Sequence, residues 1–546
     1  MYIDNKILIG KSKDKELFIV PNKANRHGLI TGASGSGKTI TLKVMAESFS
    51  SMGVPVFLAD VKGDLAGMCL PGESNEKIQE RLEGIGIKDF SFKGFPTVFW
   101  DVFGKSGHPI RATLQSIGST ILSRMLGLNE TQEGVLAIIF KIARENGYEL
   151  IDLKDLRLLL QYVAENSKQY TITYGNIASQ SVGSIQRSLL MLEEQGGDYF
   201  FGEPAIDIND FIKINENGLG NINILHATEL YKQPTLYACF LLWLLTALNG
   251  TLPEVGDLDK PKMVFFFDEA HLLFDELPDY MLTQVIQIVK LIRSKGIGLY
   301  FISQSPKDIP DEILAQLGNK VQHTLRAYTP AEQKVIKAVA DSYRANPEFN
   351  TEEAISALGT GEALISFMNE KGEPNVVEKA TILPPQSQMG SIDDSIRLMV
   401  VSKSAFMGKY DTVVDRESAF EILSKEMEEK RLAEQEAIKA KEEKKLKEEQ
   451  EKLQAKAEKE AEKMRREEEK AKKEEERIRK EEERAEEKAR KEERIKKELE
   501  KEAEKARKNS WQYKVGKQAE RTANSTINSV ARKVATQILK NIFGGK

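Results

Sequence analysis

The residues with the clearest chemical potential form a glycine-rich segment near the start of the chain. They are Gly32, Ala33, Ser34, Gly35, Ser36, Gly37, Lys38 and Thr39, which fit the pattern G-x-x-x-x-G-K-[ST] without a mismatch. Glycines let the backbone curl so that successive N–H groups point at phosphate oxygens, and a following helix adds partial positive charge. We expect Lys38 to reach the β- and γ-phosphates of a nucleotide and Thr39 to ligate Mg²⁺. An ordinary Gly/Ser turn is the competing interpretation, and the strand before the loop and the helix after it disfavour that reading.

Two adjacent acids follow a hydrophobic strand later in the chain. The apolar residues 264–267 lead directly into Asp268 and Glu269. Beside a metal-bound triphosphate, Asp268 is expected to hold Mg²⁺ through water and Glu269 to polarise the attacking water. A strand that simply ends in a solvated Asp-Glu turn is the alternative. For the nearby His271, a capping or packing role competes with a functional one.

A third polar position follows the next strand, at residues 298–303. Gln304 is the first residue of the segment Gln304-Ser305-Pro306. A polar side chain at the tip of the strand beside the acidic strand is well placed to contact the γ-phosphate, so we expect Gln304 to be this sensor. A capping residue before a proline turn explains the same segment.

Three other groups of residues have two interpretations each. Residues 60–64 (Asp-Val-Lys-Gly-Asp) follow a strand, where α/β proteins place ligand-contacting loops, although a tight turn explains them equally well. Arg293 and Arg326 are each either a surface arginine or a charge-stabilising guanidinium for a neighbouring subunit. Arg26 and His27, before the phosphate loop, are consistent with a structural role.

These residues need a scaffold of alternating strands and helices. Strands are expected at residues 17–20, 28–31, 54–60, 98–102, 221–225, 263–268, 297–303 and 363–368. Helices are expected at residues 39–52, 114–126, 131–144 and 277–294. Continuously apolar strands such as 264–267 indicate burial on both faces, as in a parallel sheet. The sequence therefore predicts an α/β body over residues 1–414, with a mostly helical insertion at about 110–200.

Composition excludes several classes of protein. The 546 residues carry 79 Lys+Arg and 84 Asp+Glu, and two cysteines, Cys69 and Cys239, cannot form a disulfide framework. The first residues lack a secretory signal, and the apolar run 236–248 is shorter than the ~20 residues that a membrane span needs. We therefore expect a cytoplasmic location and exclude a secreted scaffold, an integral membrane protein and a wholly disordered chain.

Charge divides the chain into three regions. Residues 1–414 hold about 40 basic and about 50 acidic side chains, and residues 415–509 are almost neutral although most of them are charged. The stretch 417–508 has no Gly or Pro, which predicts a long helix. Met464, Ala471 and Ile478 form one weak heptad seam, so a lone solvated helix, a weak coiled coil and partial disorder all remain open. Each of these makes the region a spacer.

The last region, 510–546, is basic. Apolar residues recur there at helical spacing from Ala519 to Ile542, with arginines and lysines off the stripe. This pattern predicts an amphipathic helix. Its apolar face could pack on a protein partner, on anionic lipid, on the body or on another copy of itself.

With these residues in hand, the body resembles the HerA/FtsK superfamily of P-loop motor ATPases, and most closely the bacterial HerA-like helicase-domain proteins of unknown function. The resemblance covers roughly residues 1–400 and resumes in the tail. It rests on the order of several segments: 25–32 before the phosphate loop, 60–65, 184–187 with 195–197, 201–204, 268–271 and 303–306.

The resemblance implies a RecA-like core, ATP hydrolysis and a homo-oligomer, a hexameric ring with DNA in its pore. By the family pattern, Gln304 is the sensor glutamine and Arg293 is the arginine that acts on a neighbour. The resulting hypothesis is a Mg²⁺-dependent ATPase that acts on DNA as a helicase-like or translocase-like motor. The alternative is a protein whose assembly or tethering is switched by ATP without translocation.

Overall fold

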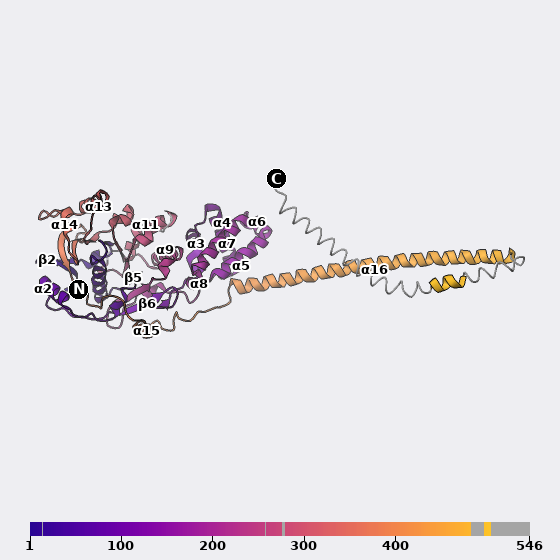
Figure 1. Ribbon diagram of the computed structural model, residues 1–546, viewed down its shortest axis with the longest axis horizontal. Helices are drawn as coiled ribbons and strands as arrows, with labels where there is room; N and C mark the ends of the chain where they lie inside the picture. The colour runs from indigo at the N-terminus through magenta and orange to yellow at the C-terminus, as the bar shows by residue number, and fades with distance from the viewer. Residues whose placement is uncertain (14, 257, 276–278, 482–495, 504–546) are drawn as a thin grey trace. The chain divides into compact units, whose positions relative to one another are not determined.

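The computed structural model describes residues 1–546 except 14, 257, 276–278, 482–495 and 504–546 (Figure 1). The chain divides into two units, Met1–Arg431 and Leu432–Lys546, which are described separately. The predicted tail helix at 510–546 and parts of the predicted helix at 415–509 lie outside the described residues. The predicted domain boundaries after residues 414 and 509 stay predictions.

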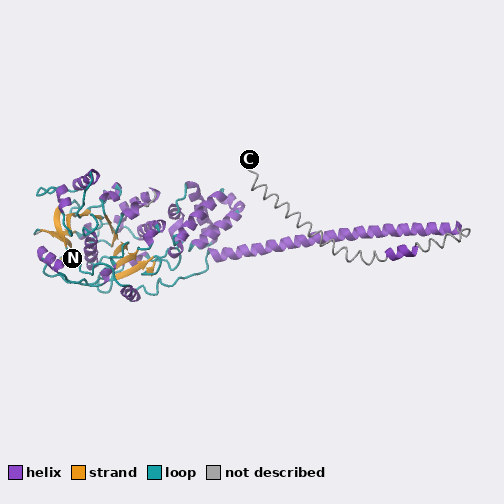
Figure 2. Ribbon diagram, viewed as in Figure 1, coloured by secondary structure: helices purple, strands orange, loops and turns teal. Residues whose placement is uncertain are grey.

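A 13-stranded sheet forms the framework of the first unit, and Figure 2 shows its strands within a shell of helices. One half of the sheet is parallel throughout. In spatial order its strands are β11 (Asn319–Gln322), β4 (Gly28–Thr31), β10 (Ile297–Ser303), β9 (Met263–Phe267), β5 (Val56–Asp60), β8 (Ile222–His226), β6 (Thr97–Asp101) and β7 (His108–Pro109). The predicted α/β fold with a mainly parallel sheet is therefore confirmed.

The other half of the sheet is antiparallel and continues from β11. Its strands are β12 (Glu362–Ser366), β13 (Glu378–Ile382), β2 (Lys6–Ser12), β1 (Tyr2–Ile3) and β3 (Lys15–Ile19), which pairs with β2. The start of the chain is thus tied to residues beyond 360 by the β2–β13 ladder.

Hydrophobic cores cover both faces of the parallel half. All five residues of β9 are buried, and alternate side chains of a strand point to opposite faces. Phe265 and Phe267 belong to the core beneath α9 (Pro234–Thr251) and α11 (Asp279–Ile292). Val264 and Phe266 belong to the core beneath α1 (Lys38–Ser51). Burial on both faces explains why these strands are continuously apolar.

The interval from 114 to 200 is helical, and Figure 1 shows its helices gathered beside β6. They are α3 (Leu114–Met125), α4 (Glu130–Asn146), α5 (Leu153–Glu165), α6 (Ser167–Tyr174), α7 (Ser179–Glu194) and α8 (Gly197–Phe200). The boundaries follow local chemistry: Asn129 and Gln132 form a capping box at the start of α4, and Gly147 ends it in a left-handed conformation.

The remaining helices connect strands or lead out of the sheet. They are α2 (Glu76–Ile85), α10 (His271–Asp275), α12 (Asp311–Leu314), α13 (Pro330–Asp341), α14 (Thr351–Ala357), α15 (Asp394–Ser402) and α16 (Ala419–Glu481). Single 3-10 turns occupy Pro21–Lys23, Ala66–Cys69, Ile208–Ile212, Leu230–Lys232, Arg293–Lys295 and Pro306–Asp308. Among the described residues, α9 is the one helix long and apolar enough to cross a membrane, but 61% of it is buried inside the protein. It serves as a core helix under the sheet.

The first turns of α16 pack on the helical insertion. Asp155, which is fully buried on α5, accepts hydrogen bonds from Ser418 Oγ at 2.5 Å and from the Phe420 backbone N–H at 2.8 Å. Lys430 donates to Asn166 at 2.7 Å. In the second unit, taken by itself, the side chains that the structure describes are almost all exposed. The 63 residues of α16 correspond to about 95 Å of helix at ~1.5 Å per residue.

Candidate active site

The glycine-rich loop joins β4 to α1, as its sequence predicts. Gly37 directly precedes the helix with a φ of 114°, a backbone conformation that side chains disfavour. Gly32 is needed for close packing, because a Cβ there would lie 2.5 Å from His323 Cβ. The loop therefore brings the free backbone N–H groups at the start of α1 to the carboxyl edge of the sheet.

Lys38 is almost fully buried at the start of α1, with 8% of its surface exposed. Its ammonium donates hydrogen bonds to Gly32 O at 2.6 Å and Ala33 O at 3.2 Å, so it closes its own loop. Burial lowers the pKa of Lys38, while the charges of Glu269 and Asp268 raise it. The loop lysine and the two acids thus lie in one electrostatic neighbourhood.

The sheet register explains this proximity. Ser303 at the end of β10 pairs with Thr31 at the end of β4, and Phe301 pairs with Phe267 at the end of β9. β10 therefore lies between the loop strand and the acidic strand, and all three end at one edge. Neighbouring strands are ~4.8 Å apart, so the loop and the acidic pair begin about 10 Å apart.

Asp268 and Glu269 are both buried directly after β9. Asp268 Oδ1 accepts the Glu269 backbone N–H at 3.0 Å, and burial, followed by the charge of Glu269, raises the pKa of Asp268 to about 7. Glu269 has a φ of 49°, which is left-handed and uncommon for a side chain of this size. This backbone turns the Glu269 carboxylate across the edge of the sheet, toward the loop after β5.

Lys62 contacts that carboxylate. Its ammonium donates to Glu269 Oε1 from the loop after β5. Burial raises the pKa of Glu269, but the hydrogen bond and charge of Lys62 outweigh burial and leave this pKa lowered. Asp60, whose own pKa is raised to about 6 by burial, accepts the backbone N–H groups of Gly63, Asp64 and Leu65. The loop 60–65 is therefore a tight turn that also reaches the site.

Several buried oxygen atoms at this edge have no hydrogen-bond partner in the described part of the chain, among them Ser36 Oγ, Asp268 Oδ2 and Glu269 Oε2. The Thr39 hydroxyl, at the start of α1, also makes no hydrogen bond with a described residue. This set of groups fits a magnesium-bound polyphosphate. Hydroxyl and carboxylate oxygens suit the hydrated cation, and the free backbone N–H groups suit the phosphate oxygens. The described residues contain no group of three or more His, Cys, Asp or Glu side chains that could hold a metal ion.

Gln304 lies at the tip of β10 and is exposed. The turn that carries it is fixed by Asp308, which accepts hydrogen bonds from Ser303 Oγ and, at 3.0 Å, from the Ser305 backbone. His271, on α10, has its Nδ1 3.2 Å from Glu269 Oε2 without hydrogen-bond geometry. The roles proposed for Gln304 and His271 stay predictions.

His323 supports the loop and was not identified from the sequence. It follows β11, with Nε2 2.8 Å from Thr41 Oγ1 of α1 and Nδ1 2.9 Å from Glu362 O. Burial lowers the pKa of His323 to about 4, so the ring is neutral. The sequence offered one signal, a histidine and a glutamine in an otherwise strand-like segment, but the segment was too polar to be recognised as a strand.

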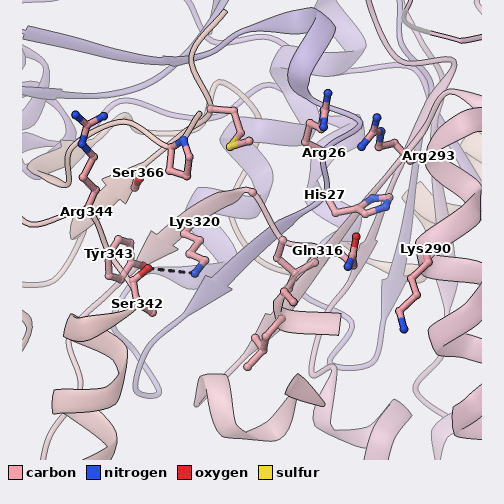
Figure 3. A pocket seen from close by; sticks show the side chains of 16 residues that line it. Arg26, His27, Lys290, Arg293, Gln316, Lys320, Ser342, Tyr343, Arg344 and Ser366 are labelled. Carbon is pink, nitrogen blue, oxygen red and sulfur yellow. Dashed lines mark hydrogen bonds between the residues drawn. The ribbon is translucent and has the colours of Figure 1, made fainter. Parts of the chain in front are cut away.

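Arg293 lies at the other edge of the sheet, directly before β10. It lines a cavity of about 340 Å³ together with Arg26, Lys320 and Arg344, and Figure 3 shows the Arg26 and Arg293 side chains near one another. The three arginines of this cavity form no side-chain hydrogen bond or ion pair with a described residue. Arg326, by contrast, is exposed after β11, at the same edge as the phosphate loop.

His27 has a structural role. Its Nδ1 accepts the Leu299 backbone N–H at 3.0 Å, and its Nε2 lies 3.0 Å from Val289 O, which makes Nε2 the protonated nitrogen. Burial lowers the pKa of His27 to about 4. The ring thus links β4 to α11 and β10, whereas the neighbouring Arg26 points into the cavity.

The fold and the site define a RecA-like P-loop ATPase. The phosphate-binding loop lies between β4 and α1, the acidic pair follows β9 two strands away, and the polar tip of β10 lies between them. The chain belongs to the family whose model is described as Helicase HerA-like C-terminal, which matches residues 5–481. The predicted membership of the HerA/FtsK superfamily is confirmed by this match.

Individual relatives extend the comparison. The DNA double-strand break repair helicase HerA of Sulfolobus acidocaldarius is 23% identical over 397 residues, 71% of each chain. The protein of the same name from Sulfurisphaera tokodaii is 26% identical over 381 residues, 67% of each chain. Among solved structures, the bacterial conjugative coupling protein TrwB matches with a TM-score of 0.47 and 12% identity, over 71% of this chain and 91% of that one. VirB4 of Thermoanaerobacter pseudethanolicus matches with a TM-score of 0.44 and 15% identity, over 70% and 97%.

Proposed function

We propose that this protein hydrolyses ATP with Mg²⁺ as a ring-forming motor that acts on DNA. The observation that carries the proposal is the set of unpartnered buried oxygens on Ser36, Asp268 and Glu269, which lie around the phosphate loop. A buried polar group without a partner costs about 1–3 kcal/mol. A bound magnesium nucleotide with its waters would satisfy all three.

The position of each residue at the edge of the sheet determines its proposed role. Backbone N–H groups of residues 32–37 and the start of α1 bind phosphate oxygens, and Lys38 exchanges its two loop carbonyls for the β- and γ-phosphates. Thr39 and Asp268 would hold Mg²⁺, which would neutralise charge on the phosphates. Glu269 orients the attacking water and accepts its proton, and Gln304 contacts the γ-phosphate.

Arg293 acts on a neighbouring subunit. The seven residues of β10 separate it from the tip that carries Gln304, a distance of about 20 Å at ~3.3 Å per residue. Its guanidinium therefore cannot reach the nucleotide of its own chain. A homo-oligomer, a hexamer by the family pattern, places this arginine and its basic cavity at the next nucleotide.

DNA as the substrate is supported by the HerA relatives, which are described as DNA repair helicases. The test measures ATP turnover with and without single- and double-stranded DNA at two salt concentrations. We expect stimulation that weakens as salt rises, because phosphate contacts release counterions. Turnover that DNA does not change at either salt concentration would contradict the DNA role.

An ATP-switched tethering protein is the second candidate. It is favoured by the firm attachment of α16 to the insertion through Asp155, which lets a long charged helix respond to the body. The same DNA titration separates the two functions. Tethering predicts DNA-independent hydrolysis together with recruitment of a protein or membrane that requires residues 510–546.

A further inference from the structure

The contact between Lys62 and Glu269 joins two loops that are 207 positions apart in the sequence. Their strands, β5 and β9, are parallel neighbours, and each residue lies just beyond the end of its strand. The Glu269 side chain is only 6% exposed, whereas the Lys62 side chain is 50% exposed. A half-exposed ammonium is thus held against a buried carboxylate.

The loop is rigid at its base and free at its tip. Asp60 Oδ1 accepts the Gly63 N–H at 2.7 Å, and its Oδ2 accepts the Leu65 N–H at 3.2 Å. The base therefore keeps Lys62 aimed at the site, while its long side chain can still change partner. The Lys62 side chain is half exposed, so a triphosphate, which carries more negative charge than one carboxylate, can compete for its ammonium.

The two oxygens of the Glu269 carboxylate have different surroundings. One oxygen of Glu269 accepts from Lys62, and the other is buried without a partner. A general base must have a free oxygen within reach of the water that it activates. The ammonium of Lys62 thus holds Oε1, one of the two oxygens that could receive the proton of that water.

We propose that Lys62 is a positioning residue that holds Glu269 away from the attacking water until ATP enters the site. The inference rests on the proposed function, because it assigns Glu269 the role of the base. Glu269 and Asp268 interact electrostatically with both Lys38 and Lys62, so both ammonium groups border the space beside these acids. A triphosphate in that space attracts Lys62 and releases Glu269.

The test uses the full-length protein with Lys62→Met, which keeps the side-chain length and removes the charge. We expect kcat for ATP without DNA to rise at least three-fold, with KM changed by less than two-fold. Lys62→Arg keeps the charge and is expected to restore the low rate of the unaltered protein. The control is Lys13→Met, which breaks an exposed ion pair with Glu348 of 3.1 Å far from the site and should leave kcat unchanged.

The inference would be overturned if Lys62→Met showed an unchanged or lower kcat or lost ATP binding. It would also be overturned if Lys62→Arg behaved like Lys62→Met. A purely structural ion pair predicts a lower thermal unfolding temperature without a higher kcat. Failure of the proposed function is recognised separately, because turnover by the unaltered protein would then not depend on Lys38. In the double variant Lys62→Met with Glu269→Gln, the gain in kcat must disappear.

Discussion

Burial determines how single residues behave around the phosphate loop. Lys38 is charged but lies among protein atoms, and it compensates by donating to two carbonyls of its own loop. Asp268, in contrast, is buried with one oxygen, Oδ2, that receives no hydrogen bond from a described residue. A magnesium nucleotide would offer phosphate oxygens to Lys38 and a hydrated cation to Asp268. Its binding would therefore offset the free-energy cost of burying these polar groups.

His323 gives a prediction at the residue scale that depends on pH. The pKa of its buried ring is about 4, against an ordinary value of 6.5, so between these values the unfolded chain binds the proton and the folded chain does not. This contribution to stability is complete above pH 6.5 and declines as pH falls toward 4. From pH 7 to pH 5 the loss is about 2 kcal/mol, at ~1.36 kcal/mol per pKa unit.

The measurement compares urea unfolding of the unaltered protein with that of His323→Asn at pH 7 and pH 5. The variant should be less stable at pH 7, and the gap should narrow by about 2 kcal/mol at pH 5. The raised pKa values of Asp60 and Asp268 oppose the trend, but they are present in both proteins and cancel in the comparison. A gap that stays constant would mean that the ring does not change its protonation on unfolding.

At the scale of elements, the parallel strands around the site could be predicted from the sequence. β4 and β10 have the expected bounds, because both are short apolar runs between turn residues. β11 was missed because Asn319, Lys320 and Gln322 make it polar. Its polarity has a structural reason: Gln322 pairs with Thr31 of β4 at 2.6 Å inside the sheet. Hydrophobic pattern alone cannot identify a strand that is buried through side-chain hydrogen bonds.

The residues of the site could be predicted from the sequence about as well as the strands around it. The glycine loop, Asp268, Glu269 and Gln304 follow local patterns, and the structure brings them to one edge of the sheet. The contacts of Lys62 and His323 join residues 207 and 282 positions apart, so no local pattern could pair them. In the antiparallel half of the sheet, β3 and β12 match predicted strands, whereas β1, β2 and β13 were not predicted. The β2–β13 ladder pairs opposite ends of the body, so no local pattern indicates it.

Asp155 gives a prediction for the attachment of α16. Its two oxygens accept four hydrogen bonds, two within the insertion, from Ile151 and Asp152, and two from Ser418 and Phe420. Asp155→Ala leaves the backbone N–H groups of Ile151, Asp152 and Phe420 without this acceptor, at about 1–3 kcal/mol for each buried group, whereas Ser418 keeps its second acceptor, Glu421. We expect amide hydrogen exchange at residues 418–421 to accelerate at least ten-fold.

The matched control is Asp415→Ala, which removes a 72% exposed partner of Lys154 from the same segment. Exposed ion pairs contribute little, so exchange at residues 418–421 should change less than three-fold. Equal acceleration in both variants would show that Asp155 does not anchor the helix.

At the scale of the whole molecule, Arg293 and the phosphate loop lie at opposite edges of one sheet. If Arg293 acts on the nucleotide of a neighbouring chain, as we propose, a complete site needs two chains, one that supplies Lys38 and one that supplies Arg293. Mixing the inactive variants Lys38→Ala and Arg293→Ala should restore activity, because some interfaces combine two intact halves. With random assembly at equal amounts, about one quarter of the interfaces are complete.

The control mixes Lys38→Ala with Glu269→Gln. Both defects belong to the nucleotide side of the interface, so no combination of these chains makes a complete site and turnover should stay at background. If the Lys38→Ala and Arg293→Ala mixture also remains at background, Arg293 does not act across subunits.

The most direct measurement of the central claim is steady-state ATP turnover with Mg²⁺ by the full-length protein and by Lys38→Ala, alongside the binding of ATP to each. Lys38 is the cation that donates hydrogen bonds to the carbonyls of the phosphate loop in the described part of the chain, so its loss should lower turnover at least 100-fold and weaken nucleotide binding. Turnover by Lys38→Ala equal to that of the unaltered protein would contradict a nucleotide site between this loop and Asp268.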